Sequence, residues 1–490
     1  MIYSKVAYNR RDKVKKHYRI FLLIISFIFQ SSYSYGAANS VWKETKQVSI
    51  STGNKTAHLV YVNLNDPKIQ IDVLPAKGKV GQVDDLKNIA NQANTSEKEA
   101  VAAINGTFFN SYDDLQPNGN IIENGKLLHV GSNGTTIGFT KDNKVLMDPV
   151  KIKVTGTING SSNWDKTWYA WNINHNDTRA EATVIFTPEY GKYTPEHNKL
   201  SVVVENGVVA EIKNGKARIP VNGYTIVVGT KGLLDRFHVG DSVEYHIEFN
   251  HLNSGNPLTG WENVDSAVGA GPMLVKDGKI VANPKNEGFT SEKILTNKGQ
   301  RSFIGVNENN VMIMGTVSSA NINELAEIAK KLGLKDAMNL DGGASSGLYY
   351  NGEYITKTGR QISNALVVSK LKQDAIKVTI NGNPLNMNVS PVMKDGTVLV
   401  PLRAIFEALN IDLEYDASTK TIYGEKEGTK IILPLGKDAT VNGQVVKLAT
   451  PAQTINGNTM VPVKFIAQST GADVKWDGAS KTVVIIINRI

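Results

Sequence analysis

The alternation of apolar and polar residues over 38–372 predicts short strands joined by tight turns. Apolar, β-branched runs are separated by Asn-Gly or Asp-Gly pairs in "VVVENGVVAEIKNG", "MLVKDGKIV" and "YYNGEYI". Such pairs favour type I′ hairpins, because both central residues of that turn need a positive φ. We therefore expect a strand-rich segment, in which residues 150–260 form a β-rich portion.

Only a few stretches show the 3.6-residue period of an amphipathic helix. One covers residues 84–94 and a second covers 321–333. In the second stretch the apolar residues fall on one side, and Gly333 suits the position that ends a helix. Strands together with these helices predict an α+β fold, a mixed catalytic domain, for residues 38–372.

A duplicated pattern follows near the C-terminus. "VPLRAIFEALNIDLEYDASTKTI" begins at Val400, and "VPVKFIAQSTGADVKWDGASKTV" begins 61 residues later at Val461. Each copy reads as a strand, a short helix and a strand. Pro401 and Pro462 suit the first helical turn, where a missing N–H is harmless. The repeat predicts a smaller domain over 375–490.

The positive charge of the chain is concentrated at its N-terminus. The net charge is +8, and residues 1–37 hold seven Lys and Arg against one Asp. The basic stretch precedes "IFLLIISFIF", which is short for a membrane span, and small residues follow. We expect 1–37 to be a secretory signal peptide, with an uncleaved anchor as the alternative. A nucleic-acid partner is not expected, and membrane contact is expected only through this leader during export.

The chain contains no cysteine. Disulfides, thiol catalysis and Cys-ligated zinc are therefore excluded. Export without cysteine suits a secreted or cell-surface protein of a Gram-positive bacterium.

One loop concentrates the candidate chemistry. In "NLDGGASSGLYYNG", at 339–352, Asp341 follows the buried-strand pattern "KDAMNL". Gly342 and Gly343 let the backbone approach a ligand closely and could hold an anion through N–H groups. Ser345 and Ser346 add hydroxyl donors. The alternative is a glycine turn with a capping aspartate.

The same loop contains "GASSG", which fits the G-x-S-x-G nucleophile elbow. That motif requires a helix after the serine and a histidine later in the chain. A hairpin pattern follows instead, and no histidine lies after His251. The sequence therefore disfavours a Ser-His-Asp hydrolase.

Four further segments appear in a fixed order around this loop. They are "AVAAINGTFFN" from Ala100, "SAVGAGPMLVKDGKIV" from Ser266, "RSFIGVNENNVMIMGTV" from Arg301 and "GRQISNALVV" from Gly359. Together with "NLDGGASSG" they resemble the phosphodiester glycosidase family over 101–368. The known animal member of that family removes N-acetylglucosamine from a sugar-phosphate diester on lysosomal enzymes. The chain departs from the family pattern at Ala344, where a third glycine is more usual, and at Ser302-Phe303, where Thr-Ala is usual. These departures leave the substrate open.

The resemblance implies a site that cleaves a sugar C1–O bond next to a phosphate. Asp341 would be the base or nucleophile, and Arg301 and Arg360 would hold phosphate oxygens. Asn105 and Asn339 would hydrogen-bond sugar hydroxyls. The remaining expected contacts with phosphate or sugar are Gly106, Gly342, Gly343, Ser345 and Ser346. Surface arginines and a turn asparagine at 105 are the alternatives.

A phosphate leaving group makes one carboxylate sufficient. A glycosidase ordinarily needs two carboxylates, one of them to protonate a poor leaving group. A phosphate monoester leaves readily, because its second pKa is about 6. Asp113 and Asp114 could supply a second acid or hold a cation, but such a pair is more often a solvated loop, so both are left out of the catalytic set. The expected substrate is a glycan or sugar phosphate of a cell wall, capsule or exopolysaccharide. A non-catalytic polysaccharide-binding protein and a phosphodiesterase that cleaves P–O are the alternatives.

The C-terminal repeat resembles the copper amine oxidase N-terminal-like domain. Copper is not expected there, because all eight histidines lie at or before His251 and cysteine is absent. The expected role is attachment to the cell wall, with a purely structural module as the alternative. No cofactor is expected for the whole chain, and calcium held by loop oxygens stays open.

Overall fold

The computed structural model describes residues 40–487, apart from 230, 373–375, 386, 388, 395, 427, 456 and 479. The predicted signal peptide at 1–37 lies outside the described residues. No helix in the described part has the length and apolarity needed to cross a membrane.

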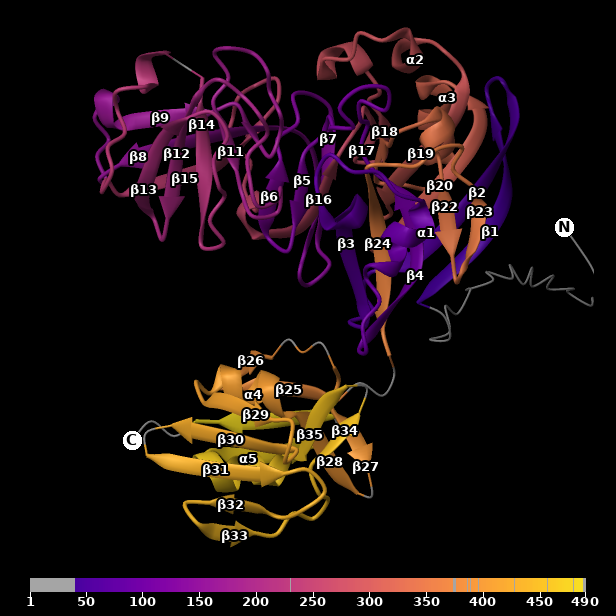
Figure 1. Cartoon of the computed structure of the whole chain (residues 1–490). Helices are drawn as coiled ribbons and strands as arrows, with labels where there is room; N and C mark the ends of the chain where they lie inside the picture. Colours follow the sequence, from indigo (N-terminus) through magenta and orange to yellow (C-terminus); the bar gives the residue numbers. More distant parts are fainter. Residues whose placement is uncertain are drawn as a thin grey trace, which may run out of the picture. The chain divides into compact units, whose positions relative to one another are not determined.

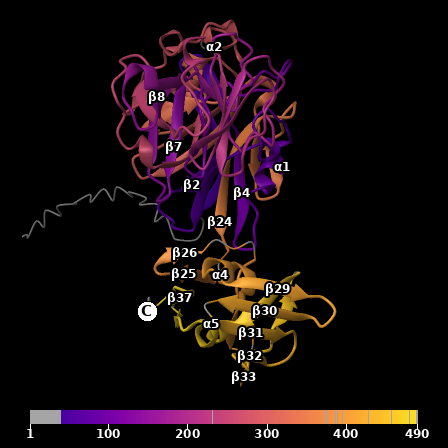
Figure 2. The same ribbon diagram turned by 60° about the vertical axis from the view of Figure 1, so that its left-hand side comes forward.

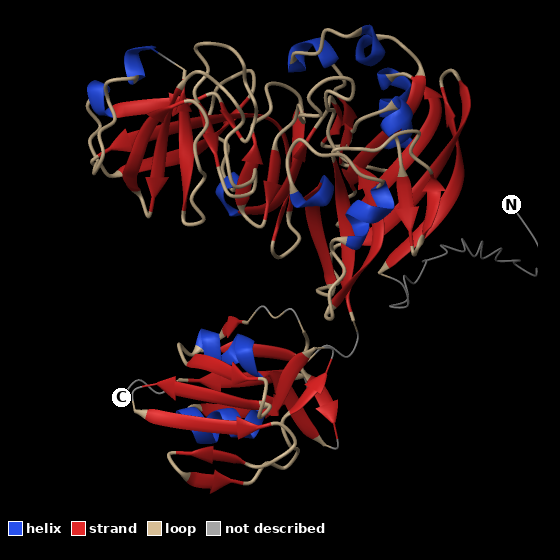
Figure 3. Ribbon diagram, in the orientation of Figure 1, coloured by secondary structure: helices blue, strands red, loops and turns tan. Residues whose placement is uncertain are grey.

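The predicted α+β class is wrong, because the protein is mostly β. Strands hold 49% of the residues and helices 12%, and strands dominate Figure 3. The longest described helix, α3 (Ile322–Lys331), has ten residues, whereas α1 (Leu86–Asn91) and α2 (Glu292–Leu295) have six and four. Antiparallel hairpins connect most strands, so the chain needs few helical crossovers. Short 3-10 helices occupy Ala76–Gly78, Trp164–Lys166, Lys231–Leu233, Trp261–Asn263, Pro284–Glu287 and Gly343–Ser345.

Two antiparallel sheets frame the region of the Asp341 loop. Sheet 1 has the order β1 (Val41–Ile50), β2 (Gly53–Asn63), β20 (Val311–Ala320), β19 (Gly299–Val306), β21 (Asp336–Asn339), β17 (Met273–Lys276) and β18 (Lys279–Ile280). Sheet 2 has the order β23 (Glu353–Thr356), β22 (Leu348–Tyr350), β4 (Lys98–Asn105), β24 (Asn364–Leu371) and β3 (Ile69–Pro75).

The inner faces of these two sheets share one hydrophobic core. Ile304 and Met338 from sheet 1 join the same buried cluster as Ile104 and Leu366 from sheet 2. Because successive side chains of a strand point to opposite faces, the neighbouring Ala103 and Ala365 turn to the outer face of sheet 2. The packing of both faces fixes the register of β4 and β24.

Two helices cover the outer faces. Leu86 and Ile89 of α1 pack on the outer face of β4 and β24, and Figure 2 shows α1 beside these strands. The helix α3 packs Leu325 and Ile328 on sheet 1 (Figure 1). Asn321 and Glu324 form a reciprocal capping box at its start, and Gly333 has φ 76° after its end. The helix predicted over 321–333 is therefore confirmed.

The predicted Asn-Gly and Asp-Gly hairpins are confirmed by their backbone angles. Asn206-Gly207 has φ values of 52° and 77°, and Asn351-Gly352 has 45° and 89°. These turns join β12 (Leu200–Glu205) to β13 (Val208–Asn214) and β22 to β23. Asp277-Gly278 joins β17 to β18 in the same way.

Two more sheets are built from the strands between residues 121 and 269. Sheet 3 has the order β15 (Val243–His251), β8 (Val145–Ile158), β7 (Thr135–Thr140), β16 (Val264–Gly269), β5 (Ile121–Glu123) and β6 (Lys126–His129), and β9 (Thr167–Ala170) pairs with β8. Sheet 4 has the order β10 (Asn172–Ile173), β11 (Val184–Phe186), β14 (Gly223–Val228), β12 and β13.

Residues 376–487 build a hydrophobic cluster of their own. Its repeats have the predicted strand, helix and strand: β28 (Thr397–Pro401), α4 (Leu402–Ala408), β29 (Asp412–Asp416), and β35 (Asn458–Pro462), α5 (Val463–Thr470), β36 (Asp473–Asp477). The equivalent residues Val400 and Val461 face each other across the β28–β35 pair. Pro401 and Pro462 end the strands, one residue before each helix begins. The domain boundaries at 37, 372 and 375 remain predictions.

The other strands of this region complete three small sheets. They are β25 (Lys377–Ile380), β26 (Asn383–Pro384), β27 (Val392–Lys394), β30 (Thr421–Lys426), β31 (Thr429–Pro434), β32 (Ala439–Val441), β33 (Gln444–Val446), β34 (Gln453–Ile455) and β37 (Thr482–Ile486).

Candidate active site

The candidate site lies where strand ends from sheets 1 and 2 meet. The strand β4 ends at Asn105, β21 ends at Asn339, and β24 begins at Asn364. The loop after β21 carries Asp341, whose backbone N–H donates to the carbonyl of Gly106 at 3.1 Å. Sequence positions more than 200 residues apart therefore meet at one point.

Asn105 holds the Asp341 loop in place. Its Nδ2 donates to the backbone carbonyl of Asp341 at 2.8 Å. Its Oδ1 accepts from the Ser302 hydroxyl at 2.7 Å and from the Gly347 N–H at 2.9 Å. The side chain is buried, and these three bonds use its oxygen and one of its two Nδ2–H groups. The expected contact between Asn105 and a sugar hydroxyl is therefore wrong, and Asn105 is a positioning residue.

Asp341 is one of the residues that line a cavity. Oδ1 accepts from the Gly342 N–H at 2.8 Å, and the Ser345 hydroxyl also donates to the carboxylate. Gly343 has φ 63°, which favours glycine and lets the loop turn back into the short helix Gly343–Ser345. The loop therefore supplies a partly satisfied carboxylate that still faces the cavity.

Burial raises the pKa of Asp341 to about 6. Two kinds of interaction oppose this rise in pKa. They are the hydrogen bonds from the Ser345 hydroxyl and the Gly342 N–H, and the positive charges of Arg360 and Arg301. A carboxyl group with a pKa near 6 is largely ionised at pH 7 and can still exchange a proton there. This property suits a general base.

The cavity above Asp341 has a volume of about 820 Å³. One part of its lining is apolar and includes Phe108 and Phe289, whose rings meet edge to face with centroids 5.9 Å apart. The cationic part of the lining consists of Lys293, Lys298, Arg301 and Arg360. The cavity therefore offers a carboxylate, cations and an apolar wall to one ligand.

Arg301 is held mostly by the protein itself. Its Nε donates to the carbonyl of Ala320 at 3.0 Å, and Nη2 donates to the carbonyls of Lys293 and Asn297 at 2.6 and 2.7 Å. Nη1 has no hydrogen-bond partner among the described residues. The expectation of a paired phosphate grip by Arg301 is therefore wrong in part, because only one nitrogen remains for a ligand.

Arg360 lies at the cavity rim and contacts the loop after β4. Nη1 donates to the Ser111 hydroxyl, and Nη2 donates to the Tyr112 hydroxyl at 3.1 Å. The guanidinium carbon lies 5.1 Å from the centroid of the Tyr112 ring. These contacts orient Arg360, and its charge lowers the pKa of Asp341. Arg360 and Asp341 therefore line one cavity, and their shared role in a site stays a prediction.

Three of the predicted binding residues do not line the cavity. Asn339 is buried, and its Nδ2 donates to the carbonyl of Gly271 at 2.8 Å. Ser346 is buried, and its hydroxyl has no partner within the described part of the chain. Gly106 packs against Asn364, whose Oδ1 would lie 1.9 Å from an added Cβ. None of these three residues is among those that line the cavity, so this geometry does not support their expected contact with the substrate.

Gly342, Gly343 and Ser345 do line the cavity, as predicted. Ser345 belongs to a single 3-10 turn that leads into the strand β22, and no long helix follows it. Its hydroxyl donates to Asp341, and no histidine is among the described residues that line the cavity. The geometry of a nucleophile elbow is therefore not present at Ser345.

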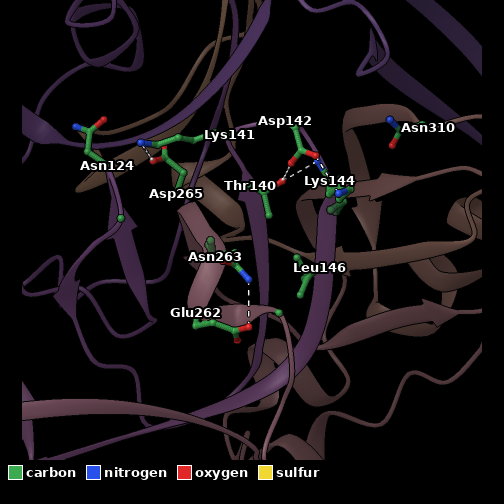
Figure 4. Close-up of a pocket in the computed structure, with 14 residues that line it drawn as sticks. Asn124, Thr140, Lys141, Asp142, Lys144, Leu146, Glu262, Asn263, Asp265 and Asn310 are labelled. Carbon is green, nitrogen blue, oxygen red and sulfur yellow. Dashed lines mark hydrogen bonds and ion pairs between the residues drawn. The ribbon is translucent and has the colours of Figure 1, made fainter. Parts of the chain in front are cut away.

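A second, larger hollow of about 970 Å³ lies elsewhere on the molecule. Figure 4 shows two of its carboxylates facing lysines: Asp142 lies 3.0 Å from the ammonium of Lys144, and Asp265 lies 3.9 Å from that of Lys141. The third, Glu262, accepts from the Asn263 side chain at 3.1 Å. None of the residues predicted for the site lines this hollow. We therefore place the candidate site at Asp341.

Several cavity residues were not predicted from the sequence. Ser111 and Tyr112 reach Arg360 from a loop, and Asp113 of the pair interpreted as solvated also lines the cavity. Asp114 instead caps its own turn, accepting from Asn110 and from the Gln116 N–H. The sequence signal for these residues was the "NSYDD" loop at 110–114, which follows the strand that ends at Asn105. The residue that this loop contacts, Arg360, lies about 250 positions further along the chain.

Residues 198–369 match the family model described as Phosphodiester glycosidase, and residues 379–485 match the one described as Copper amine oxidase N-terminal domain. Asp341, Arg301 and Arg360 fall inside the first range. A protein of Brevibacillus choshinensis, named a protease inhibitor, is 30% identical over 121 residues. That match covers 24% of this chain and 37% of the relative, so the chain spans well under half of that protein's length.

Two solved structures share the fold. A hypothetical protein from Synechocystis has a TM-score of 0.60 and 23% identity, with 68% of this chain and 62% of that chain covered. A protein from Burkholderia pseudomallei K96243 has a TM-score of 0.52 and 16% identity, with 65% and 74% covered. The family match indicates a glycosidase-type hydrolase. The chain thus carries one segment, 198–369, that matches the phosphodiester glycosidase model and a second, 379–485, that matches the copper amine oxidase N-terminal domain model, as the two resemblances in the sequence predicted.

Proposed function

We propose that the protein hydrolyses the sugar C1–O bond of glycosyl-1-phosphodiesters. The observation that carries this proposal is the position of Asp341, which lines the cavity of about 820 Å³ together with Arg301 and Arg360 and interacts with the charges of both. A carboxylate that acts at C1 and cations that hold the adjoining phosphate are the two groups that this reaction needs.

The cationic wall supports a phosphate ligand. Arg301 has one nitrogen without a partner in the described structure, and Arg360 lies at the rim of the same cavity. Guanidinium N–H groups bind phosphate oxygens strongly, and low local polarity strengthens the attraction. The phosphate therefore lies between these two side chains in the proposed complex.

Asp341 supports attack at the anomeric carbon. A water oxygen bonds to C1, the C1–O bond breaks, and its electron pair stays on the phosphate monoester. Asp341 either takes the proton from that water or attacks C1 itself, forming an ester that water then hydrolyses. The anomeric configuration of the product distinguishes the two routes. Neither route needs protonation of the leaving group, because the second pKa of a phosphate monoester is about 6.

Two other functions give different products from the same substrate. A non-catalytic polysaccharide-binding protein would bind the diester and release no product. A phosphodiesterase would break P–O and release a sugar phosphate with an alcohol. Product analysis therefore separates the three functions.

The test uses an N-acetylglucosamine-1-phosphodiester and measures the free reducing sugar. We expect turnover by the wild type and a loss of at least 100-fold in Asp341→Asn. Asp142→Asn is the matched control, because Asp142 is an exposed aspartate in the other hollow, and we expect it to keep full activity. Equal turnover by wild type and Asp341→Asn would contradict the assignment of Asp341.

We propose in addition that the protein acts outside the cell on cell-wall or exopolysaccharide material. The composition of residues 1–37 supports export. Residues 379–485 are proposed as a module for attachment to the cell wall. Binding of the full chain to purified wall fragments, measured by co-sedimentation, tests the attachment.

A further inference from the structure

We infer that Tyr415 and Trp476 are two equivalent contact sites for the sugar rings of a glycan, one in each repeat of the C-terminal region. This inference rests on the proposed attachment of residues 379–485 to the cell wall, and it assigns two residues and a ligand class to that role. The two aromatic residues occupy the same position of the repeat, 61 residues apart. Both side chains reach solvent, with Tyr415 50% exposed and Trp476 40% exposed.

The two rings have the same place in the fold. Tyr415 lies opposite Ile422 in the β29–β30 pair, and Trp476 lies opposite Val483 in the β36–β37 pair. Among the described strands, β29 and β36 are each the end strand of a sheet. Each repeat therefore presents one aromatic residue at a sheet edge.

The turn that follows each ring is repeated as well. Asp416 accepts a hydrogen bond from the Thr419 hydroxyl at 2.8 Å, and Asp477 accepts one from the Ser480 hydroxyl at 2.6 Å. Aspartate side chains that bond to the residues after them stabilise tight turns. The backbone next to both rings is therefore fixed before a ligand binds, which lowers the entropy cost of binding.

Packing of the core does not require an aromatic residue at this position. Leu413 and Val474 lie two residues earlier on the same face of their strands, and both pack against the hydrophobic core of this region. A side chain of that size would fill the buried part of the next inward position too. The exposed part of each ring leaves apolar surface in water. Because a ring stands in both repeats, as Tyr in one and Trp in the other, we assign it a binding role.

The charges beside the rings indicate that the contacted surface of the ligand is uncharged. Glu414 precedes Tyr415, whereas Lys475 precedes Trp476, and both of these charged residues are exposed. A ligand common to both sites therefore cannot be selected by one sign of charge. A pyranose ring fits this requirement, because the C–H groups on one of its faces form an apolar surface that packs on an aromatic ring.

A protein partner suits the two rings less well than a glycan. A stable protein interface needs a continuous surface of about 800 Å² on each partner, with few charged residues at its centre. Tyr415 and Trp476 belong to different sheets. Each ring is followed by a turn of exposed polar residues, such as Ser418 and Lys420 in the first repeat. A small apolar contact with polar surroundings matches a single sugar ring.

The experiment measures how many molecules of an N-acetylglucosamine hexasaccharide the full chain binds in equilibrium dialysis. This probe is uncharged and consists of pyranose rings. Tyr415→Leu and Trp476→Leu keep an apolar side chain for the buried contacts and remove the ring. We expect each single variant to bind one molecule fewer than the wild type, and the double variant to bind two fewer. Counting the loss leaves any molecule bound at the Asp341 cavity out of the comparison.

Co-sedimentation with purified peptidoglycan measures the same contacts on a polymer. We expect the apparent Kd to rise about three- to tenfold for each ring that is removed. Tyr423→Leu is the matched control, because Tyr423 is 41% exposed and lies in the same sheet, opposite Glu414. The equivalent position of the second repeat is Val484, so Tyr423 is not a repeated ring. We expect its apparent Kd to stay within about twofold of the wild-type value.

The outcomes separate this inference from the proposed attachment. Equal hexasaccharide binding by the wild type and the double variant, or none by the wild type, would overturn the inference. If the double variant still binds peptidoglycan fully, the attachment stands and the role of the rings is overturned. Loss of peptidoglycan binding without any hexasaccharide binding would point to a peptide ligand and would overturn the glycan. Hexasaccharide binding through both rings without peptidoglycan binding would support the inference and contradict attachment to the wall.

Discussion

The Asn105 side chain donates a hydrogen bond to the backbone carbonyl of Asp341 at 2.8 Å, across 236 positions of sequence. The reverse link is the bond from the Asp341 N–H to the carbonyl of Gly106. These two bonds join the end of β4 to the loop after β21. The position of the proposed catalytic carboxylate is therefore set by sheet 2 as well as by sheet 1.

Asn105→Asp is expected to destabilise the fold at neutral pH. The substitution keeps the shape but places an oxygen against the Asp341 carbonyl, where a donor is needed. Unfolding free energy should fall by about 2–4 kcal/mol at pH 7. The new carboxyl group can donate when it is protonated, so its pKa is raised in the folded state and the lost stability returns as the pH is lowered.

Urea denaturation of wild type and Asn105→Asp at pH 7 and pH 5 measures this difference. Asn263→Asp is the control, because Asn263 is exposed, and its effect should stay within about 0.5 kcal/mol. A destabilisation by Asn105→Asp that is equal at both pH values would contradict the donor role of Asn105.

Arg360→Met is expected to shift the pH dependence of activity. The charge of Arg360 lowers the pKa of Asp341, which burial raises to about 6. Without that charge the pKa of Asp341 rises further. Because the active form of Asp341 is ionised, the acidic limb of kcat/KM should move from about pH 6 to a higher pH, by several tenths of a unit. A lower rate with an unmoved limb would show that Arg360 does not act on Asp341.

Asp341→Asn is expected to stabilise the protein above pH 6. The folded-state pKa of about 6 exceeds the ordinary value of 3.8, so the native state binds the proton more tightly than the unfolded state. Stability therefore falls as the pH rises from about 4 to about 6, and the cost persists above that range. The neutral amide avoids this cost, about 1–3 kcal/mol at pH 7.5 and near zero at pH 4.

Calorimetric unfolding of wild type and Asp341→Asn at these two pH values tests the sign of the effect. We expect a higher Tm for Asp341→Asn at pH 7.5 and equal Tm values at pH 4. A lower Tm for the variant at pH 7.5 would mean that the carboxylate stabilises the native state.

Arg301→Lys is expected to loosen the cavity wall while keeping the charge. The guanidinium ties together the carbonyls of Ala320, Lys293 and Asn297. A single ammonium cannot reproduce this planar, three-way geometry. We expect KM to rise about tenfold or more and amide hydrogen exchange over 293–297 to speed up. Exchange in α3 serves as the internal control, and unchanged exchange at 293–297 would contradict the wall-fixing role of Arg301.

Local features of the fold were predicted where the sequence signal is local. Neighbouring residues determine three such features: the Asn-Gly hairpins, the helix α3 followed by Gly333, and the repeat around Val400 and Val461. The α+β class was wrong, because an apolar stripe identifies a helix that covers a sheet without revealing how much of the chain is strand.

The site was predicted in part for the same reason. The motifs in the sequence predicted that Asp341, Arg301 and Arg360 lie close together, and the three residues line one cavity in the structure. The contact of Arg360 with Tyr112 joins loops next to β24 and β4, which pair within sheet 2, whereas the burial of Asn105 depends on how sheets 1 and 2 pack. No local pattern encodes either. Asn339 and Ser346 were predicted to bind the substrate because they are polar and lie next to Asp341 in the sequence. In the structure both are buried, and neither lines the cavity.

The most direct test of the proposed function is hydrolysis of an N-acetylglucosamine-1-phosphodiester in water enriched with oxygen-18, followed by mass spectrometry of both products. If C1–O is cleaved, oxygen-18 is expected on C1 of the free sugar, and the phosphate monoester is expected to be unlabelled. A short reaction time limits the exchange of the C1 oxygen with water. Label in the phosphate product would show that P–O is cleaved and would contradict attack at C1 by way of Asp341.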